Sequence, residues 1–264
     1  MMENRYIILD TRLIIRPETK FLKKAVEYAL GDFDERFYEN NSVSKECHIF
    51  LKKAGKNIEL IWNNEAYICE DANDAIAKLY KKIGDFYSRY EYFHAGVVNF
   101  NGYSIALVGP KGSGKTTLTL GLVKQGFKFL TDESAFFDVR SGNFMPFLRP
   151  LKLLNNTKGK RFMHINRLFP NSVGKPSPPK YLFIMDGLRK NFKAKKAFVR
   201  KIKKYEAMPR LLASGFKTPG DFKSRFIACA AIVEKADCFE IIRGDIDNAI
   251  FQITKIAGCK YSIC

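Results

Sequence analysis

The sequence has 264 residues and a mass of 30.3 kDa, enough for one large domain or two modest ones. Apolar residues make up 46% of the chain and charged residues 27%, a mixture that argues against an intrinsically disordered protein, a collagen or a coiled coil. Lysine and arginine number 45 against 27 acidic residues. The net charge of +18 favours anionic partners, namely nucleotides, nucleic acid, acidic proteins or an anionic membrane surface, unless it serves solubility alone.

The cysteine and histidine content predicts neither a disulfide scaffold nor a structural metal site. The six cysteines form no CxxC pair, and the three histidines have no zinc-ligand spacing. The N-terminal segment lacks the apolar core of a signal peptide, and no stretch of about 18 apolar residues is present to span a membrane. We therefore expect a cytoplasmic protein with no membrane span.

Residues 1–88 are expected to form a small α+β accessory domain. Strand character over Arg5–Ile15 precedes helical spacing over Leu22–Leu30, and Asp71–Tyr80 combines helical spacing with an acidic start. Two short apolar runs, Cys47–Leu51 and Ile58–Trp62, flank the residues AGKN and are typical of a hairpin. We find no motif in this part that indicates a chemistry.

Residues 89–264 are predicted to form a second domain of the α/β class, with the boundary near Arg89. The domain opens with a hairpin, because AGVVNF and YSIALV flank Asn101-Gly102, and both positions of this dipeptide tolerate the positive φ of a type I′ turn. The second strand leads into GPKGSGKTT. A helical pattern over Leu118–Lys124 and an apolar strand over Phe127–Leu130 follow.

The C-terminal part mixes basic and apolar segments. Beyond Pro150 the chain is predicted to be basic and rich in loops as far as Pro179, and the run YLFIM at 181–185 then indicates a strand. Helical patterns near Glu206–Ala213 and Asp247–Ala257 close the chain. The densest basic run, residues 189–204, carries nine basic residues and apolar ones at helical spacing. It is either a solvated amphipathic helix or a docking site for an acidic substrate.

Residues 109–116 match the pattern G-x-x-x-x-G-K-[ST] of a phosphate-binding loop without a deviation. Glycines in such a loop let consecutive backbone N–H groups point at phosphate oxygens, and the following helix adds the positive end of its dipole. Lys115 would reach the β- and γ-phosphates of ATP, and the Thr116 hydroxyl would hold Mg²⁺. The competing interpretation is a glycine-rich turn that binds nothing. The predicted nucleotide-binding residues are Gly109, Lys111, Gly112, Ser113, Gly114, Lys115, Thr116 and Thr117.

An acidic pair and a histidine accompany this loop. Asp132 and Glu133 follow an apolar strand, where nucleotide enzymes place a carboxylate beside the metal. Only 17 positions separate Asp132 from Lys115, which indicates a more compact arrangement than that of common P-loop NTPases. His94 precedes Gly109 by 15 positions, so pairing across the predicted hairpin brings it beside the loop. There it serves either packing or function.

The segment HAGVVNFNGYSIALVGPKGSGKTT, a short helix and then GFKFLTDE resemble the catalytic core of HPr kinase/phosphorylase and its HPr-kinase-like relatives. The resemblance covers about residues 90–150 and implies an HPr-kinase-like domain over 89–264, with a fold related to phosphoenolpyruvate carboxykinase. It implies that Asp132 is the base that deprotonates a serine hydroxyl, that Glu133 holds the second acidic position, and that His94 and Lys115 complete the catalytic set. Residues 147–161 resemble the R-P-L segment of smaller HPr-kinase-like proteins, whose substrates vary.

The leading hypothesis is an ATP- and Mg²⁺-dependent kinase that phosphorylates a hydroxyl group, either of a serine in a polypeptide or of a small-molecule alcohol. Thr116 and Glu133 would hold the metal. One alternative is a regulatory module that binds nucleotide without catalysis, and another is a nucleic-acid-associated NTPase. No RNP-like motif or zinc finger supports the last, so we expect no specific nucleic-acid partner. The sequence leaves open the acceptor, ATP against pyrophosphate as donor, and whether the chain forms a homo-oligomer.

Overall fold

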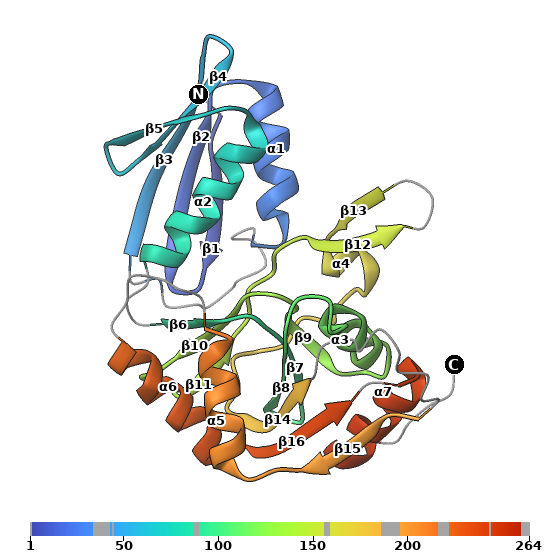
Figure 1. The fold of residues 1–264 in the computed structure, drawn as a ribbon. Coiled ribbons are helices and arrows are strands. Elements are labelled where there is room, and N and C mark those ends of the chain that lie inside the picture. Colours follow the sequence, from blue (N-terminus) through green and yellow to red (C-terminus); the bar gives the residue numbers. More distant parts are fainter. Residues whose placement is uncertain are drawn as a thin grey trace. The chain divides into compact units, whose positions relative to one another are not determined.

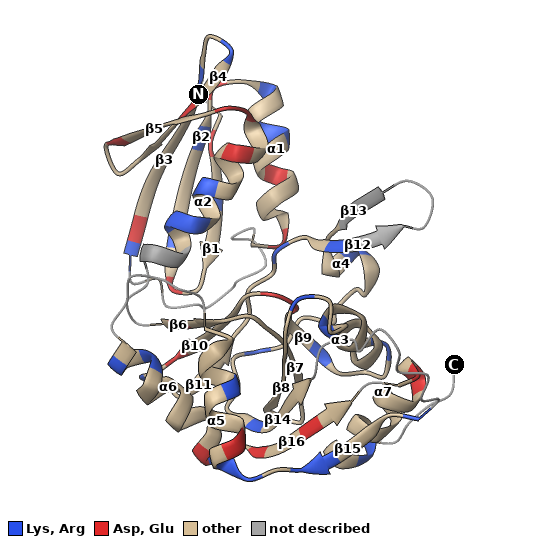
Figure 2. Cartoon of the chain, viewed as in Figure 1, with Lys and Arg blue, Asp and Glu red and all other residues tan. Residues whose placement is uncertain are grey.

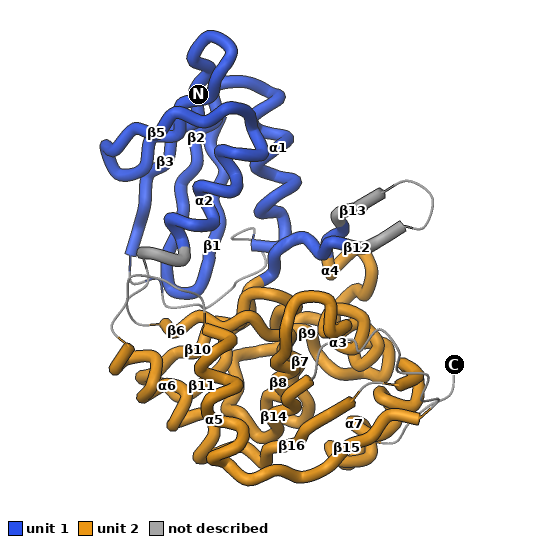
Figure 3. Tube along the Cα trace, viewed as in Figure 1, with its two compact units in different colours: residues 1–87, 148–164 blue, residues 88–147, 165–264 orange. Residues whose placement is uncertain are grey.

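The computed structural model describes residues 2–33, 43, 45–86, 90–155, 159–185, 196–215, 222–242 and 244–259 (Figure 1). The chain divides into two units, which are described separately below (Figure 3). Unit 1 comprises residues 1–87 and 148–164, and unit 2 comprises residues 88–147 and 165–264. The predicted boundary near Arg89 lies outside the described residues. The predicted second domain of 89–264 is interrupted, because residues 148–164 belong to unit 1.

Unit 1 is built on a five-stranded sheet with the order β1-β2-β3-β4-β5. Neighbouring strands are antiparallel except for the parallel pair β2 and β3. Strand β3 shows why one face is buried, since Cys47, Ile49 and Leu51 alternate with polar or partly exposed residues. The strands are β1 (Asn4–Ile8), β2 (Thr11–Pro17), β3 (Lys45–Ala54), β4 (Asn57–Trp62) and β5 (Glu65–Cys69).

Helices α1 (Lys20–Leu30) and α2 (Ala72–Phe86) pack side by side on one face of this sheet (Figure 1). The Thr19 hydroxyl caps α1 by accepting a hydrogen bond from the backbone N–H of Leu22. The two helices are joined by a hydrogen bond of 2.6 Å from the Tyr80 hydroxyl to the carbonyl oxygen of Ala29. The predicted helices and the predicted hairpin of this part are therefore present, at slightly different bounds.

Residues 148–164 join unit 1 through a buried polar contact. After the hairpin of β12 (Leu151–Asn155) and β13 (Gly159–Met163), the Nδ1 atom of His164 lies 3.0 Å from Oδ2 of Asp32 in the 3₁₀ turn Gly31–Phe33. Both residues are only 5% exposed. The prediction of a loop-rich segment from Pro150 to Pro179 is wrong for the first part, where strand pairing forms β12 and β13 and α4 (Ile165–Leu168) follows in unit 2. It is confirmed for residues 169–178, which contain neither a helix nor a named strand.

Unit 2 is built on a six-stranded mixed sheet with the order β15-β16-β14-β8-β7-β9. Strand β14 pairs in parallel with β8 and β16, whereas β7 is antiparallel to β8 and β9. The turn between β7 and β8 has positive φ at Asn101 (50°) and Gly102 (81°), as the sequence predicted. The strands are β7 (Ala95–Phe100), β8 (Tyr103–Val108), β9 (Lys128–Thr131), β14 (Pro179–Met185), β15 (Phe198–Lys201) and β16 (Asp237–Ile242).

Helices cover this sheet. Helices α5 (Lys204–Ala213) and α6 (Phe222–Lys235) share one apolar core with residues of β7, β8 and β14. Helix α3 (Lys115–Lys124) packs on β7 and β8 and against α7 (Ile246–Ala257), where Gly121 leaves room for Ile250. A smaller sheet with the order β11-β10-β6 completes the unit. Its strands are β6 (Tyr90–Phe93), β10 (Ala135–Asp138) and β11 (Asn143–Met145).

The described part of the basic run, residues 196–204, differs from the amphipathic helix that its spacing predicted. Residues 189–195 lie outside the described residues, and residues 198–201 form strand β15, which pairs with β16. Arg200 and Lys201 form ion pairs with Glu240 and Asp237. Pairing with a neighbouring strand outweighs local spacing here, and part of the positive charge is neutralised within the unit.

Basic residues are present in both units. In the view of Figure 2, Lys and Arg lie on helices and strands of both units. Over the described residues, no helix is both long enough and apolar enough to cross a membrane.

Candidate nucleotide-binding site

The topology of unit 2 brings the predicted site residues to one edge of the sheet. Strands β8, β9 and β14 run in the same direction, and their carboxyl ends meet at this edge, where the antiparallel β7 begins. Ala95 pairs with Val108, so His94 and Gly109 are the next residues along the two strands. Open α/β sheets bind ligands outside the carboxyl ends of their parallel strands.

The loop that follows β8 has the conformation that its glycines allow. Gly112 and Gly114 have φ angles of 82° and 89°, in the left-handed region that favours glycine. Gly109 is required for a different reason, because a Cβ there would lie 2.7 Å from the carbonyl oxygen of Met185 on β14. Gly114 is the N-cap of α3, and no side chain caps the helix there. The first N–H groups of the helix point toward the loop, as they do at any helix N-terminus, and are not used by a capping side chain.

The Lys115 side chain folds back into this loop. It is 5% exposed, and its Nζ donates hydrogen bonds to the carbonyl oxygens of Gly109 at 2.7 Å and Pro110 at 2.9 Å. Burial lowers the pKa of the ammonium to about 8, while the nearby carboxylates of Glu133 and Asp132 act in the opposite direction. The loop thus holds a buried cation next to its own backbone.

Thr116 connects the loop to the acidic pair. Its hydroxyl donates a hydrogen bond of 3.0 Å to Oδ2 of Asp132. Strand β9 ends at Thr131, so Asp132 and Glu133 lie on the bend beyond the strand, and the alternation of a strand does not set their directions. Asp132 is partly buried against Thr116, whereas Glu133 is exposed and exerts its charge on Lys115 and His94. The two carboxylates have different neighbours.

His94 is partly buried next to the loop, with its backbone N–H bonded to the carbonyl oxygen of Ser214 at 2.8 Å. Burial lowers the pKa of the imidazole, and so does the positive charge of Lys115. The charge of Glu133 and a hydrogen bond with the Glu133 backbone act in the opposite direction. A predominantly neutral ring is therefore expected at pH 7.

The remaining predicted loop residues divide by exposure. The Ser113 side chain is buried, and its backbone N–H bonds to the carbonyl oxygen of Pro110. Lys111, Gly112 and Thr117 are exposed at the surface of the loop and of the first turn of α3. All the predicted site residues thus belong to unit 2 and lie on the loop, on its helix or on the two chain segments beside it.

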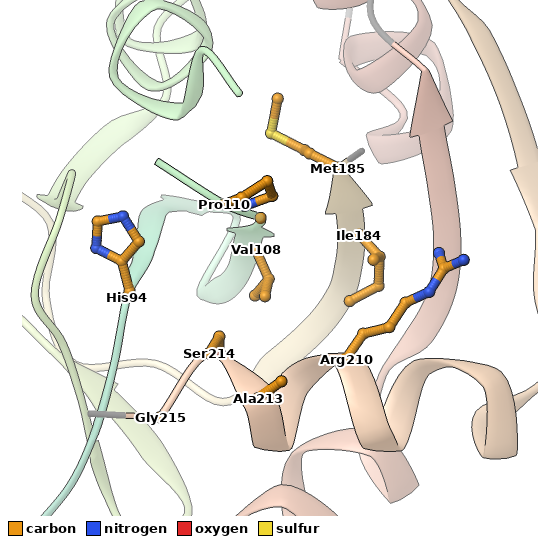
Figure 4. Close-up of a pocket in the computed structure, with 10 residues that line it drawn as sticks. His94, Val108, Pro110, Ile184, Met185, Arg210, Ala213, Ser214 and Gly215 are labelled. Atoms are coloured by element: carbon orange, nitrogen blue, oxygen red, sulfur yellow. The ribbon is translucent and has the colours of Figure 1, made fainter. Parts of the chain in front are cut away.

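A pocket of about 540 Å³ opens beside the start of the loop (Figure 4). Sequence reasoning identified His94 and Gly109 among its lining residues and missed those of β14 and α5. The sequence predicted a strand at 181–185 but not its partner, and Met185 reaches the pocket because this strand is parallel to β8 and ends at the same edge. The lining residues are His94, Val108, Gly109, Pro110, Ile184, Met185, Arg210, Ala213, Ser214 and Gly215.

Within the described ranges, no group of three or more His, Cys, Asp or Glu side chains is arranged to hold a metal ion. Mg²⁺ bound together with a nucleotide does not need such a group, because phosphate oxygens and water complete its coordination around one or two protein oxygens. The Thr116 hydroxyl and the Asp132 carboxylate, 3.0 Å apart, are oxygen donors of the required kind.

Comparisons with known proteins give a structural likeness only. No protein-family model matches the sequence, and no curated protein matches it. The chain is similar to the HPr(Ser) kinase/phosphatase from Coxiella burnetii, with 10% sequence identity and a TM-score of 0.35, over 64% of this chain and 98% of that chain. Membership of the family that the sequence motifs resemble stays a prediction.

Proposed function

We propose that the chain is an ATP- and Mg²⁺-dependent kinase that transfers the terminal phosphoryl group to a hydroxyl of a serine in a polypeptide or of a small-molecule alcohol. One observation carries the proposal. The loop at 109–116 combines two left-handed glycines, a helix N-terminus, a buried lysine and a threonine that bonds to an acidic residue. Each of these features serves phosphate or metal binding, and together they favour a nucleotide over a surface turn.

Different groups of the loop would bind different parts of the nucleotide and its metal ion. Backbone N–H groups of the loop and of the first turn of α3 would donate to phosphate oxygens. Lys115 would exchange its bonds to the carbonyl oxygens of Gly109 and Pro110 for phosphate oxygens, which compensate a buried cation better. Bound Mg²⁺ would neutralise charge on the terminal phosphates. Much of the rate gain would come from positioning and charge neutralisation.

Two assignments of the acidic pair compete. The resemblance in sequence gives Asp132 the role of base and places Glu133, with Thr116, on the metal. The hydrogen bond from Thr116 favours the reverse, because it puts Asp132 on the hydroxyl that would hold Mg²⁺. Glu133 meanwhile is close enough to His94 for its charge to oppose the lowering of the His94 pKa by burial and by Lys115. We propose Asp132 as the base and treat the reversed roles as the alternative that mutation decides.

Nucleotide binding is the direct test. Isothermal titration of the full chain with ATP and Mg²⁺ should give saturable binding that Lys115→Ala weakens strongly. Lys124→Ala, at the other end of α3, is the matched control and should leave binding unchanged. Equal binding by both variants would remove the loop from the proposed function.

A further inference from the structure

The pocket beside the loop has walls that are held in place. Val108 and Ile184 belong to paired strands β8 and β14. On the opposite side, His94 bonds through its N–H to the carbonyl oxygen of Ser214, and Phe93 forms a β-bridge with Gly215. The pocket is therefore built by the fold of unit 2 itself, which is what a site for a small ligand requires.

The pocket adjoins the end of the loop that would hold the terminal phosphates. Gly109 and Pro110 line it, and the carbonyl oxygens of the same two residues accept the hydrogen bonds of Lys115. Lys115 is the residue predicted to reach the β- and γ-phosphates. A molecule in the pocket therefore lies next to the group that would be transferred.

The pocket lining is mostly apolar, with a polar group on one side. Apolar side chains form much of the lining, including Ile184, Met185 and Ala213. Arg210 contributes its aliphatic stem, because its guanidinium donates a hydrogen bond of 2.6 Å to Glu240. The polar imidazole of His94 stands across the pocket from Ile184 and Arg210 (Figure 4). The lining thus suits a molecule with one polar end and an apolar body.

The size of the pocket fits the same kind of molecule. Sites for small molecules usually enclose about 300–1,000 Å³ and are lined mainly by apolar side chains with a few placed polar groups. A volume of about 540 Å³ lies within this range. A serine presented on the surface of a folded protein needs a shallow approach to the loop and would leave the apolar walls beyond it uncovered.

From these observations we infer that the acceptor is a small alcohol with an apolar body, bound with its hydroxyl toward His94 and the loop and its body against Ile184, Met185 and Ala213. This inference rests on the proposed kinase function and narrows it to one class of acceptor. In the transfer step, the acceptor oxygen bonds to the γ-phosphorus while the bond from that phosphorus to the bridging oxygen breaks, and ADP leaves. The hydroxyl proton passes to Asp132, the proposed base.

The test uses the full chain with ATP, Mg²⁺ and linear primary alcohols of two to eight carbons, with ester formation followed by ³¹P NMR. Each added methylene that enters the pocket should raise kcat/KM about three- to fourfold, until the pocket is full. Ala213→Leu adds volume at the pocket wall and should lower kcat/KM for the longest productive alcohol at least tenfold. It should leave the ATP Kd within twofold. Tyr205→Leu changes an exposed residue of the same helix that does not line the pocket, and should have no effect.

Three results would overturn the inference while leaving the kinase proposal standing. One is a flat kcat/KM across the alcohols or no ester from any of them, with ATP still bound through Lys115. Another is weaker ATP binding in Ala213→Leu, which would assign the pocket to the nucleotide base. The third is phosphorylation of a serine peptide that Ala213→Leu leaves unchanged. Failure of ATP binding itself would instead reject the proposed function.

Discussion

The two units use similar elements, helices on a mixed sheet, but they differ in where the strands end. In unit 1 the strands are antiparallel except for one pair, and hairpins join β1 to β2 and β3 to β4. In unit 2 the parallel strands β8 and β14, together with β9, end at one edge, and the loop after β8 lies there. A sheet with several carboxyl ends at one edge can gather distant residues around a ligand, and unit 2 carries the candidate site.

Buried polar groups show the same contrast. In unit 1, Asp32 and His164 are buried against each other and hold a chain segment in place. In unit 2, Ser113 and Lys115 are buried at the loop, and Lys115 bonds only to backbone carbonyls in its described hydrogen bonds. Removing His164 should therefore reduce stability, whereas removing Lys115 at the loop should reduce activity. The following predictions test that difference, from the largest expected effect to the smallest.

Lys115→Ala should produce the largest loss of activity. We expect ATP-dependent turnover to fall on the order of 10³-fold, because the variant lacks the charge that compensates the terminal phosphates. Stability should change little, because the hydrogen bonds of Lys115 to two backbone carbonyls offset only part of the cost of burying its charge, and the variant removes both the bonds and the cost. Steady-state kinetics and urea denaturation measure the two effects. Unchanged turnover in a folded variant would contradict the role of the loop.

Asp132→Asn should lower kcat about 10²-fold or more while the ATP affinity stays within a few-fold, since loss of a general base has costs of this size. Glu133→Gln should mainly shift the Mg²⁺ concentration that gives half-maximal activity. Rates measured across a Mg²⁺ series for both variants separate the two roles. If Glu133→Gln loses kcat and Asp132→Asn shifts the Mg²⁺ dependence, the roles are reversed, as the Thr116 hydrogen bond favours.

His164→Ala should act on unit 1 alone. Its removal leaves the buried carboxylate of Asp32 without the hydrogen bond that the structure shows, and we expect a loss of about 1–3 kcal/mol in the free energy of unfolding. ATP binding at 25 °C should persist. His48→Ala is the control, because the His48 side chain is exposed, and this substitution should change stability little. An equal effect of the two substitutions in chemical denaturation would show that the buried contact contributes nothing.

Much of the local structure could be predicted from the sequence, because local signals determine it. Asn101-Gly102 specified a turn, the glycines of the loop specified its conformation, and helical spacing identified α1, α2, α3, α5 and α7. Helix α6 was not predicted, and the helical spacing around residue 198 belongs to strand β15. Contacts between distant residues had no such signal. His164 meets Asp32 across 132 positions, and β15 is a strand because β16 pairs with it. The pocket walls on β14 and α5 likewise depend on the order of strands in the sheet, and local sequence patterns do not specify that order.

The smallest predicted effect concerns Glu240, whose carboxylate accepts hydrogen bonds of 2.6 Å from both Arg200 and Arg210. Burial acts to raise the pKa of this carboxyl, but the bonds from Arg210 and Arg200 prevail and hold it below the ordinary value of 4.5. Because the pKa of Glu240 is lower in the folded chain than in the unfolded one, its bonds to the two arginines stabilise the fold fully above about pH 4.5. That contribution is lost as the pH falls through the folded-state pKa.

Glu240→Gln should therefore reduce the free energy of unfolding at pH 7 by on the order of 1 kcal/mol, a modest value because both guanidinium groups are partly exposed to water. The difference from the unmodified chain should shrink as the pH is lowered below about 4.5. Glu234→Gln, at an exposed position of α6, controls for the loss of a charge and should show no such pH dependence. Urea denaturation at a series of pH values measures both variants. A stability difference that is the same at pH 7 and pH 3 would mean that packing, and not the charge of Glu240, holds the two arginines in place.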